Sequence, residues 1–439
     1  MPPCSPRGTR GLHSPRVCLT LCSSSNIVKI LQSMRRRVLV TSLNLITPLG
    51  IDLKASWQGL VEGRSGIGKI SLFDCSGHET RIAGEVPADF DDYARAHCSR
   101  RLANQMGRAI KMGYVCAKEA ISGSGIDFDA YDRTRCAVIV GAADTGHSSI
   151  HDSKYWIMKT MPHGVSAWVS QEYQLEGPNF TISAACASSA YAIAYGYDLI
   201  SSNRADIVVA GGASSIVNPE HIGGFNELGA LSVANDAPER ASRPFSMDRN
   251  GFVIGEGAGV LVLESEESAT TRGADVYAEV AGYGLSSEAY NIMAPRPGGA
   301  GMAKTMRMAL ADAGVAREEV DYINAHGSST PLGDKYETMA IKDVFGDLAY
   351  RIPVSSDKSM IGHTAGACGV IEAAITVMSV RHGILTPTIN YTPDPELDLD
   401  YVPNDARTRD VRVALSNSFA FGGCNAALVL RKYAKERSA

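Results

Sequence analysis

Hydrophobic runs of strand length alternate with longer stretches of helical periodicity along the chain from Met34 onward. The run at 206–213 (DIVVAGGA) is apolar throughout its centre, and continuous runs of this kind are typical of a sheet buried on both faces. Strands are predicted at 36–42, 136–141, 179–183, 206–213, 257–264, 276–283, 320–325, 352–355, 411–417 and 425–431. Helices are predicted at 52–62, 102–122, 187–201, 303–314, 334–345 and 366–382. This alternation predicts an α/β fold.

The two halves of the chain resemble each other in this pattern. In the first half a strand leads into Cys186 and a helix of small residues. In the second half the strand at 352–355 leads into Lys358, His363 and another small-residue helix. We therefore expect an internal duplication, with domains at 34–267 and 268–434 and a cleft between them formed by loops at strand ends.

The first 33 residues do not follow the pattern. They are rich in Ser, Pro and Arg, and the first acidic residue of the chain is Asp52. Two interpretations stay open: an organelle transit peptide, or an extension upstream of a start at Met34. We expect this leader to be disordered. The first interpretation implies a mitochondrial or plastid location, and the second a cytoplasmic one.

Composition narrows the class of protein. The net charge of −5 argues against nucleic acid as the main partner. The sequence contains no apolar run of about 18 residues, so no membrane span is expected. Its ten cysteines are scattered, with neither zinc-ligand spacing nor a disulfide framework, which indicates a reducing compartment.

Cys186 lies where a strand gives way to a helix. The sequence changes from β-branched residues at 181–182 to small residues at 183–190 (SAACASSA). A thiol at a helix N-terminus meets unpaired N–H groups and the helix dipole, which favour the thiolate, so we expect a lowered pKa and a nucleophile. The alternative is a buried structural cysteine.

Three further stretches carry reactive groups. His326 follows a strand in a Gly/Ser/Thr loop, Lys358 and His363 precede a helix, and 416–426 (SNSFAFGGCNA) forms a Gly-rich turn with two aromatic residues. Each stretch alone is weak evidence for a catalytic site, because a histidine beside a strand is more often a structural residue than a catalytic one. Together with Cys186 they supply a thiol, two imidazoles, an ammonium and backbone N–H donors. Acyl transfer requires such a set.

On these stretches, together with 243–252 (RPFSMDRNGF) and 255–259 (GEGAG), the chain from Met34 to Arg431 resembles the β-ketoacyl-[acyl carrier protein] synthases of the KAS I/II type. In the KAS III-like branch an Asn replaces the second His, and chain-length-factor subunits lack the cysteine. The resemblance implies a thiolase-like fold, in which two duplicated βαβαβαββ halves form a five-layered α-β-α-β-α core.

The resemblance also implies the reaction, which is a decarboxylative Claisen condensation of fatty acid biosynthesis. Cys186 would take an acyl chain from an acyl carrier protein. Malonyl carrier protein would then lose CO2, and the resulting enolate, stabilised by His326 and His363, would attack the Cys186 thioester. Lys358 would organise the site electrostatically. The product would be a β-ketoacyl chain two carbons longer.

Supporting roles are implied for several other residues. The backbone N–H groups of Cys186 and Phe421 would form the first oxyanion hole, and Phe421 and Phe419 belong to the gate. Glu372 and Asp334 would support the Lys358 network, Ser328 and Thr330 would bind the phosphopantetheine arm, and Asp144 would lie at the floor of the acyl pocket. We expect no metal or redox cofactor, because the pantetheine arrives on the carrier protein. A homodimer is expected.

Several positions depart from the family pattern. Ala420 replaces a glycine of the gate, which would be costly if that glycine needs a positive φ, and Cys424 replaces a threonine. Asp144 places a carboxylate where an apolar residue is usual, the segment from Asp144 to Cys186 is short, and 231–236 (LSVAND) lacks a basic residue for an acidic carrier. An alternative is therefore a ketosynthase of a type II polyketide or polyene pathway, which would work as a heterodimer with a chain-length factor. A non-catalytic scaffold of the same fold and a thiolase are weaker alternatives.

Overall fold

A computed structural model describes residues 35–143 and 153–435. The chain divides into two units, Met1–Arg35 and Arg36–Ala439, and the second holds all the elements given below. The leader predicted at 1–33 and Asp144 both lie outside the described residues, so the predictions made for them remain predictions.

Ten strands form one sheet in the order β10-β9-β13-β14-β8-β1-β7-β6-β4-β5. The strands are β1 (Val38–Ile46), β4 (Cys136–Gly141), β5 (Asn179–Ile182), β6 (Ile207–Ser214), β7 (Gly257–Ser265), β8 (Ala278–Ser287), β9 (Tyr322–Asn324), β10 (Val354–Ser355), β13 (Val413–Phe419) and β14 (Cys424–Arg431). The other strands of the described residues form two short antiparallel pairs: β2 (Ile67–Lys69) with β3 (Ile82–Gly84), and β11 (Ile384–Leu385) with β12 (Arg407–Thr408).

The sheet confirms the predicted duplication. In the first half β4 pairs parallel with β5 and β6, and β7 pairs antiparallel with β6 and β1. In the second half β9 pairs parallel with β10 and β13, and β14 pairs antiparallel with β13 and β8. The two five-stranded halves therefore share one topology. They meet through the antiparallel pair of β1 and β8, from Val38↔Val280 to Val40↔Ala278.

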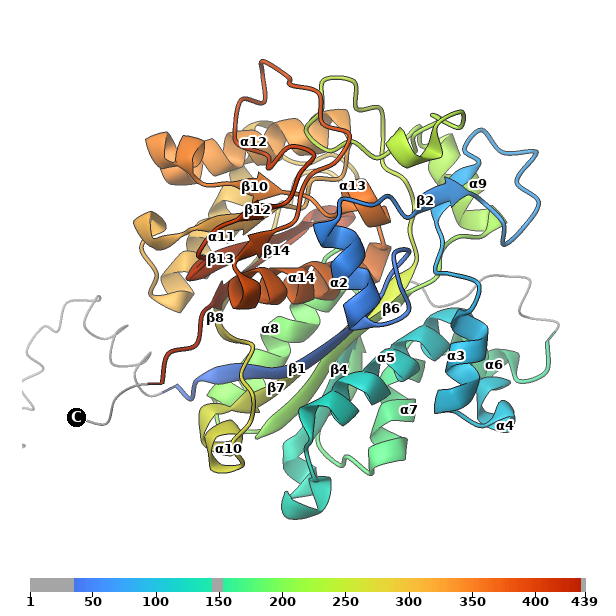
Figure 1. The fold of residues 1–439 in the computed structure, drawn as a ribbon, viewed down its shortest axis with the longest axis vertical. Helices are drawn as coiled ribbons and strands as arrows, with labels where there is room; N and C mark the ends of the chain where they lie inside the picture. The colour runs from blue at the N-terminus through green and yellow to red at the C-terminus, as the bar shows by residue number, and fades with distance from the viewer. Residues whose placement is uncertain (1–34, 144–152, 436–439) are drawn as a thin grey trace, which may run out of the picture. The chain divides into compact units, whose positions relative to one another are not determined.

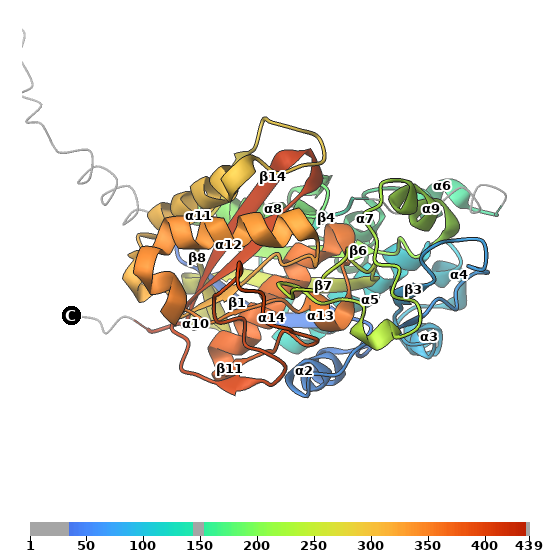
Figure 2. The same ribbon diagram turned by 90° about the horizontal axis from the view of Figure 1, so that it is seen from above.

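Helices cover both halves and fill the space between them. They are α2 (Leu53–Val61), α3 (Phe90–His97), α4 (Arg100–Ala103), α5 (Arg108–Ser124), α6 (Trp156–Thr160), α7 (Gly164–Tyr173), α8 (Ser188–Ser201), α9 (Pro219–Glu227), α10 (Glu266–Thr271), α11 (Ala300–Ala313), α12 (Pro331–Phe345), α13 (Lys358–Ile361) and α14 (Cys368–His382). Figure 1 shows α8 and α14 between the two halves of the sheet. Helices α5 and α7 pack on the outside of the first half, and α11 and α12 lie side by side outside the second (Figure 2). The result is the five-layered thiolase-like core.

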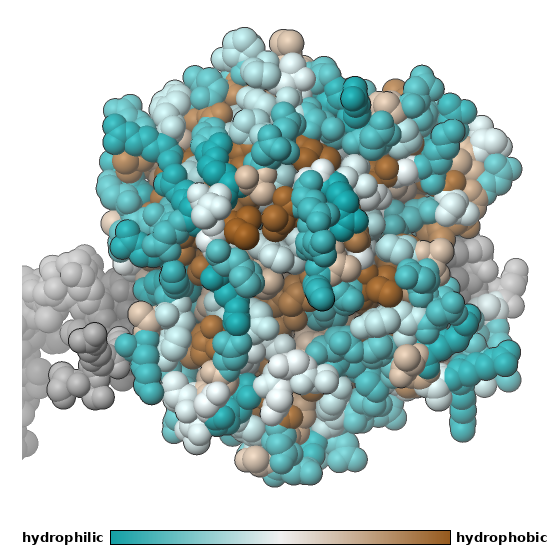
Figure 3. Space-filling view, viewed as in Figure 1, coloured by the Kyte–Doolittle hydropathy of each residue, from teal (hydrophilic) through white to brown (hydrophobic). Residues whose placement is uncertain are grey.

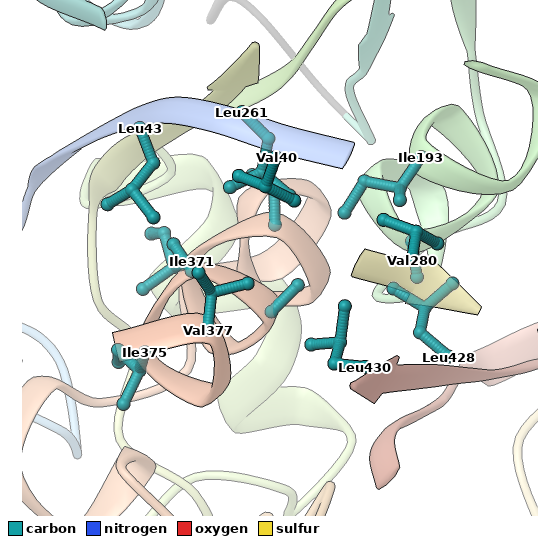
Figure 4. Packing of buried hydrophobic residues seen from close by; sticks show 14 of the residues in the cluster. Val40, Leu43, Ile193, Leu261, Val280, Ile371, Ile375, Val377, Leu428 and Leu430 are labelled. Atoms are coloured by element: carbon teal, nitrogen blue, oxygen red, sulfur yellow. The ribbon is translucent and has the colours of Figure 1, made fainter. Parts of the chain in front are cut away.

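Helix α14 is buried and α8 largely so, because both sequences consist mostly of apolar or small residues. In α14 every residue from Cys368 to Val380 is buried, as is expected of a helix without a polar face. Figure 4 shows side chains of both central helices and both half-sheets meeting in one cluster, among them Ile193, Ile371, Val40 and Leu428. The small residues let α8 and α14 approach closely, and this places Cys186 and His363, which precede these two helices, near one cavity.

Every predicted strand and helix is present, most of them with shifted ends, but the sequence pattern did not predict α3, α7 and α9 or the shortest helices. The helix predicted at 102–122 begins at Arg108, after Gly107 and the separate short helix α4. Among the described residues, no helix is long and apolar enough to cross a membrane. Hydrophilic residues cover most of the face in Figure 3, and hydrophobic residues show there only in small separate groups.

Candidate active site

Cys186 lies on a tight turn between β5 and α8. Ala185, just before it, has a φ of 47°, a left-handed conformation that costs a non-glycine residue about 1–3 kcal/mol. The turn is fixed by Ser188, whose Oγ accepts the Ala184 N–H at 2.8 Å and donates to the Ala185 carbonyl at 2.6 Å. The turn therefore presents Cys186 to a cavity of about 530 Å³ in a fixed position.

The expected lowering of the Cys186 pKa is wrong. Burial raises the pKa of this thiol to about 11, although Lys358 and the backbone N–H groups of Phe421 and Cys186 act in the opposite direction. Desolvation outweighs these favourable groups, because the sulfur is enclosed by protein. The thiol is therefore neutral in the free enzyme. The same N–H groups, of Phe421 and Cys186, are those expected at the first oxyanion hole, and the structure brings both to the sulfur.

His326 and His363 lie together in the cavity, with ring centroids 5.4 Å apart and ring planes at 82°. Burial, and next the charge of Lys358, lower the pKa of His363 to about 3 and that of His326 well below its usual value. Both imidazoles are therefore neutral at physiological pH. The Ala365 N–H donates to His363 Nδ1 at 3.0 Å, which assigns the ring proton to Nε2. His363 can thus donate a hydrogen bond from Nε2.

Lys358 is almost completely buried between the two halves of the site. Its Nζ donates to the His326 carbonyl oxygen at 2.6 Å and forms an ion pair with Glu372. Burial alone would lower the pKa of Lys358, but Glu372, Cys368 and Glu337 together raise it above its ordinary value. The ammonium therefore stays charged, and the prediction that Glu372 belongs to its network agrees with this contact.

Asp334 and Glu337 lie one turn apart on α12. Asp334, predicted in the Lys358 network, instead accepts the N–H groups of Phe245 at 2.7 Å and Ser329 at 3.1 Å, and burial raises its pKa to about 7. Glu337, which the sequence analysis missed, accepts the N–H groups of His326 at 2.9 Å and Gly327 at 2.8 Å. Glu337 thus holds the backbone of the His326 loop. The i, i+3 spacing of the two acids is the pattern that could have revealed it.

The gate is the turn Phe421–Gly423. Gly422 has a φ of 77° and Gly423 one of 74°, and the Gly422 N–H donates to the Ile292 carbonyl at 2.7 Å. Ala420 has a φ of −111°, so alanine is not strained at this position. Phe421 is 37% exposed at the cavity, whereas Phe419 is buried with its ring 6.3 Å from that of His326. Of the two aromatic residues, only Phe421 lies at the turn itself.

Ser328 and Thr330 line the cavity, and their hydroxyl oxygens are 3.0 Å apart. Thr330 also caps α12 by accepting the Gly333 N–H at 3.2 Å. The walls beside them are largely apolar, with Phe225, Phe252 and Met293 among the lining residues. The cavity therefore combines an apolar channel with hydroxyl groups on one wall.

This fold and site define a condensing enzyme of the acyltransferase class. The sequence matches "Beta-ketoacyl synthase, N-terminal domain" over residues 35–269 and "Beta-ketoacyl synthase, C-terminal domain" over residues 277–392. The chain belongs to the β-ketoacyl synthase family.

Curated relatives include proteins named 3-oxoacyl-[acyl-carrier-protein] synthase 2. The chain is 42% identical to that of Synechocystis sp. over 413 residues and 40% identical to that of Coxiella burnetii over 412, each match covering 91% of this chain and 99% of the relative. Similar solved structures include the ishigamide ketosynthase/chain length factor, with a TM-score of 0.84 at 36% identity, and a β-ketoacyl synthase from Burkholderia phymatum, with a TM-score of 0.82 at 33% identity. Each covers 91% of this chain and is itself covered completely.

Proposed function

We propose that this protein is a 3-oxoacyl-[acyl carrier protein] synthase of fatty acid biosynthesis, which joins malonyl carrier protein to an acyl chain held on Cys186. One observation supports this best: Cys186, His326 and His363 line a single cavity, and the N–H of Phe421 reaches the Cys186 sulfur. A nucleophile, two neutral donors and an oxyanion hole are the groups that the condensation requires.

The first half-reaction is a thioester exchange. The Cys186 sulfur attacks the acyl thioester, and the carrier leaves as a free thiol that takes up the proton lost by Cys186. The Phe421 and Cys186 N–H groups stabilise the tetrahedral oxyanion, and the charge of Lys358 stabilises the sulfur as its proton departs. Because the resting thiol is neutral, these groups act mainly as the transition state forms.

The second half-reaction needs donors for an enolate. Malonyl carrier protein loses CO2, and the electron pair of the broken C–C bond becomes an enolate whose oxygen accepts hydrogen bonds from His326 and His363. Neutral rings with low pKa values donate these bonds without giving up a proton, which preserves the nucleophilic enolate. The enolate attacks the Cys186 thioester, and Cys186 leaves and regains a proton.

Ser328 and Thr330 fit the role of holding the pantetheine arm, since their hydroxyl groups stand on the wall of the apolar channel. The partner is then an acyl carrier protein, which brings the pantetheine itself. The two half-reactions use only groups of this chain and of the substrates, so we propose that the chemistry needs no metal or redox cofactor.

A second copy of the chain fits one edge of the sheet. Among the described residues, β5 and β10 are the two edge strands, and Phe180 on β5 packs against Tyr195 of α8, with both rings exposed. An unpaired edge presents backbone N–H and C=O groups to a partner, and a two-fold axis there would continue the sheet into another subunit. Light scattering on the purified protein tests this: a dimer that Phe180→Asp dissociates supports it, and a monomeric wild type refutes it.

A polyketide ketosynthase is the second candidate function, and two of the similar solved structures support it. One similar structure, at 32% identity and a TM-score of 0.81, is a type II PKS acyl-carrier protein in complex with its ketosynthase, and another pairs a ketosynthase with a chain length factor. The relatives at about 40% identity are named 3-oxoacyl-[acyl-carrier-protein] synthase 2, which favours a function in fatty acid biosynthesis.

The test is incubation with malonyl carrier protein and a panel of acyl carrier proteins, with the products read by mass spectrometry. Saturated acyl carriers should each yield one β-ketoacyl product two carbons longer. Repeated extension without reduction would support the polyketide alternative, and absence of any condensed product would refute both.

A further inference from the structure

Cys368, the first residue of α14, brings a second thiol next to the nucleophile. Its Sγ donates to the Cys186 carbonyl oxygen at 3.0 Å. The Cys368 sulfur, a ring nitrogen of His326 and a carboxylate oxygen of Glu372 all lie within 4.8 Å of one another. The condensation described above makes no use of this thiol, although the other two groups serve it.

Two of these side chains have unsatisfied polar atoms. Among the described residues, His326 Nδ1 and Glu372 Oε2 are buried without a hydrogen-bond partner, and the two side chains are 8% and 1% exposed. Buried polar atoms are nearly always paired, so the site has capacity for a further ligand. Lys358 occupies only the other carboxylate oxygen, Oε1.

We propose that Cys368, His326 and Glu372 form a binding site for a borderline-soft divalent cation such as Zn2+, which inhibits the enzyme by immobilising His326. Thiolate, imidazole and carboxylate are the common protein ligands of Zn2+. Metal–ligand distances of about 2.0–2.3 Å place tetrahedral ligands about 3.3–3.8 Å apart, so a contraction of about 1 Å completes the site.

The local charges favour a cation there. Glu372, Glu337 and Asp357 all interact electrostatically with Lys358, so three buried carboxyl groups surround one ammonium. A bound cation relieves this excess of acidic groups. The Cys368 thiol releases its proton to solvent as the metal–sulfur bond forms.

The ion must enter through the substrate cavity, because His326 lines that cavity, whereas Cys368 and Glu372 are buried behind its wall. Binding would take His326 away from the enolate and would compete with malonyl carrier protein. The site is therefore inhibitory, and the inference goes beyond the proposed reaction, which needs no metal.

The test compares the full-length wild type with Cys368→Ala, Cys368→Ser and Cys116→Ala. Cys116 is a matched control, because its thiol is also buried and donates to a carbonyl, that of Asn44, at 3.2 Å. Co2+ is the spectroscopic probe, since a cobalt–thiolate bond gives a charge-transfer band whether or not the protein condenses anything. All other cysteines remain in every variant, so their contribution cancels.

The wild type and Cys116→Ala should show the Co2+ band, and both Cys368 variants should lose it. The Zn2+ concentration that halves malonyl decarboxylation should rise at least about tenfold in the Cys368 variants. An unchanged band and unchanged Zn2+ sensitivity in Cys368→Ala would overturn the inference. A protein that binds Co2+ through Cys368 yet condenses no substrate would retain the site and refute only the proposed function.

Discussion

Lys358 donates a hydrogen bond from Nζ to the backbone carbonyl oxygen of His326 at 2.6 Å, across 32 residues of sequence. This contact and the ion pair with Glu372 join α13, α14 and the His326 loop inside the core. Lys358 thus both positions the His326 imidazole and stabilises the domain.

Replacing Lys358 with methionine should lower stability and abolish condensation. The variant keeps most of the side-chain volume but leaves Glu372 buried without its partner, which costs about 3–5 kcal/mol. Urea unfolding measures this loss. Lys335→Met is the control, because Lys335 forms a surface pair with Glu396 and its removal should leave the free energy of unfolding almost unchanged. Equal losses in the two variants would contradict the structural role of Lys358.

His363 should matter far more to decarboxylation than to acyl loading. His363→Ala removes one enolate donor, so malonyl decarboxylation should fall about 10²–10³-fold. Loading of Cys186 uses the Phe421 and Cys186 N–H groups and should change only a few-fold. Radiolabelled malonyl turnover and intact-protein mass spectrometry measure the two steps separately. Equal loss of both steps would mean that His363 acts on the whole site rather than on the enolate.

The reactivity of Cys186 should keep rising with pH. Burial raises the pKa of the thiol to about 11, so between pH 7 and 9 the thiolate fraction, and the rate of alkylation by iodoacetamide, should increase about tenfold per pH unit. The adduct at Cys186 is followed by mass spectrometry, with Cys186→Ala to identify reaction elsewhere. A rate that levels off below pH 8 would show that the N–H groups and Lys358 outweigh desolvation after all.

The contact between the two central helices should tolerate no added atom. A Cβ on Gly369 would lie 2.6 Å from the Ala190 backbone nitrogen, so Gly369→Ala should destabilise the protein by about 1–3 kcal/mol and reduce activity by moving the Cys186 turn. Gly224→Ala in α9 is the matched helical control, with no atom within 4 Å of its Cβ, and should stabilise by about 0.4–1 kcal/mol. Thermal unfolding of both variants measures the difference, and a neutral Gly369→Ala would show that the helices can separate without cost.

Much of this architecture could be predicted from local patterns. Continuous apolar residues predict buried strands such as 206–213. The two small-residue helices indicated the duplication that the sheet topology confirms. The position of Cys186 between a strand and a helix could also be predicted from the sequence. The direction of its pKa shift could not be predicted, because desolvation depends on how completely the two halves enclose the sulfur.

The contacts that the sequence could not reveal are long-range. Glu337 reaches the backbone of the His326 loop only because α12 packs against it, and Asp334 turns to Phe245, which lies far away in the sequence. Cys368 gave no local indication of its role, since its position beside the Cys186 carbonyl arises from the packing of α8 against α14.

The covalent intermediate on Cys186 is the central claim, and intact-protein mass spectrometry tests it most directly. The enzyme is incubated with an acyl carrier protein in the absence of malonyl carrier protein, beside Cys186→Ala and the thiol control Cys424→Ala. The account predicts one acyl adduct per chain in the wild type and in Cys424→Ala, none in Cys186→Ala, and loss of the adduct when malonyl carrier protein is added. Condensation by Cys186→Ala at the wild-type rate, or an adduct that malonyl carrier protein leaves in place, would contradict it.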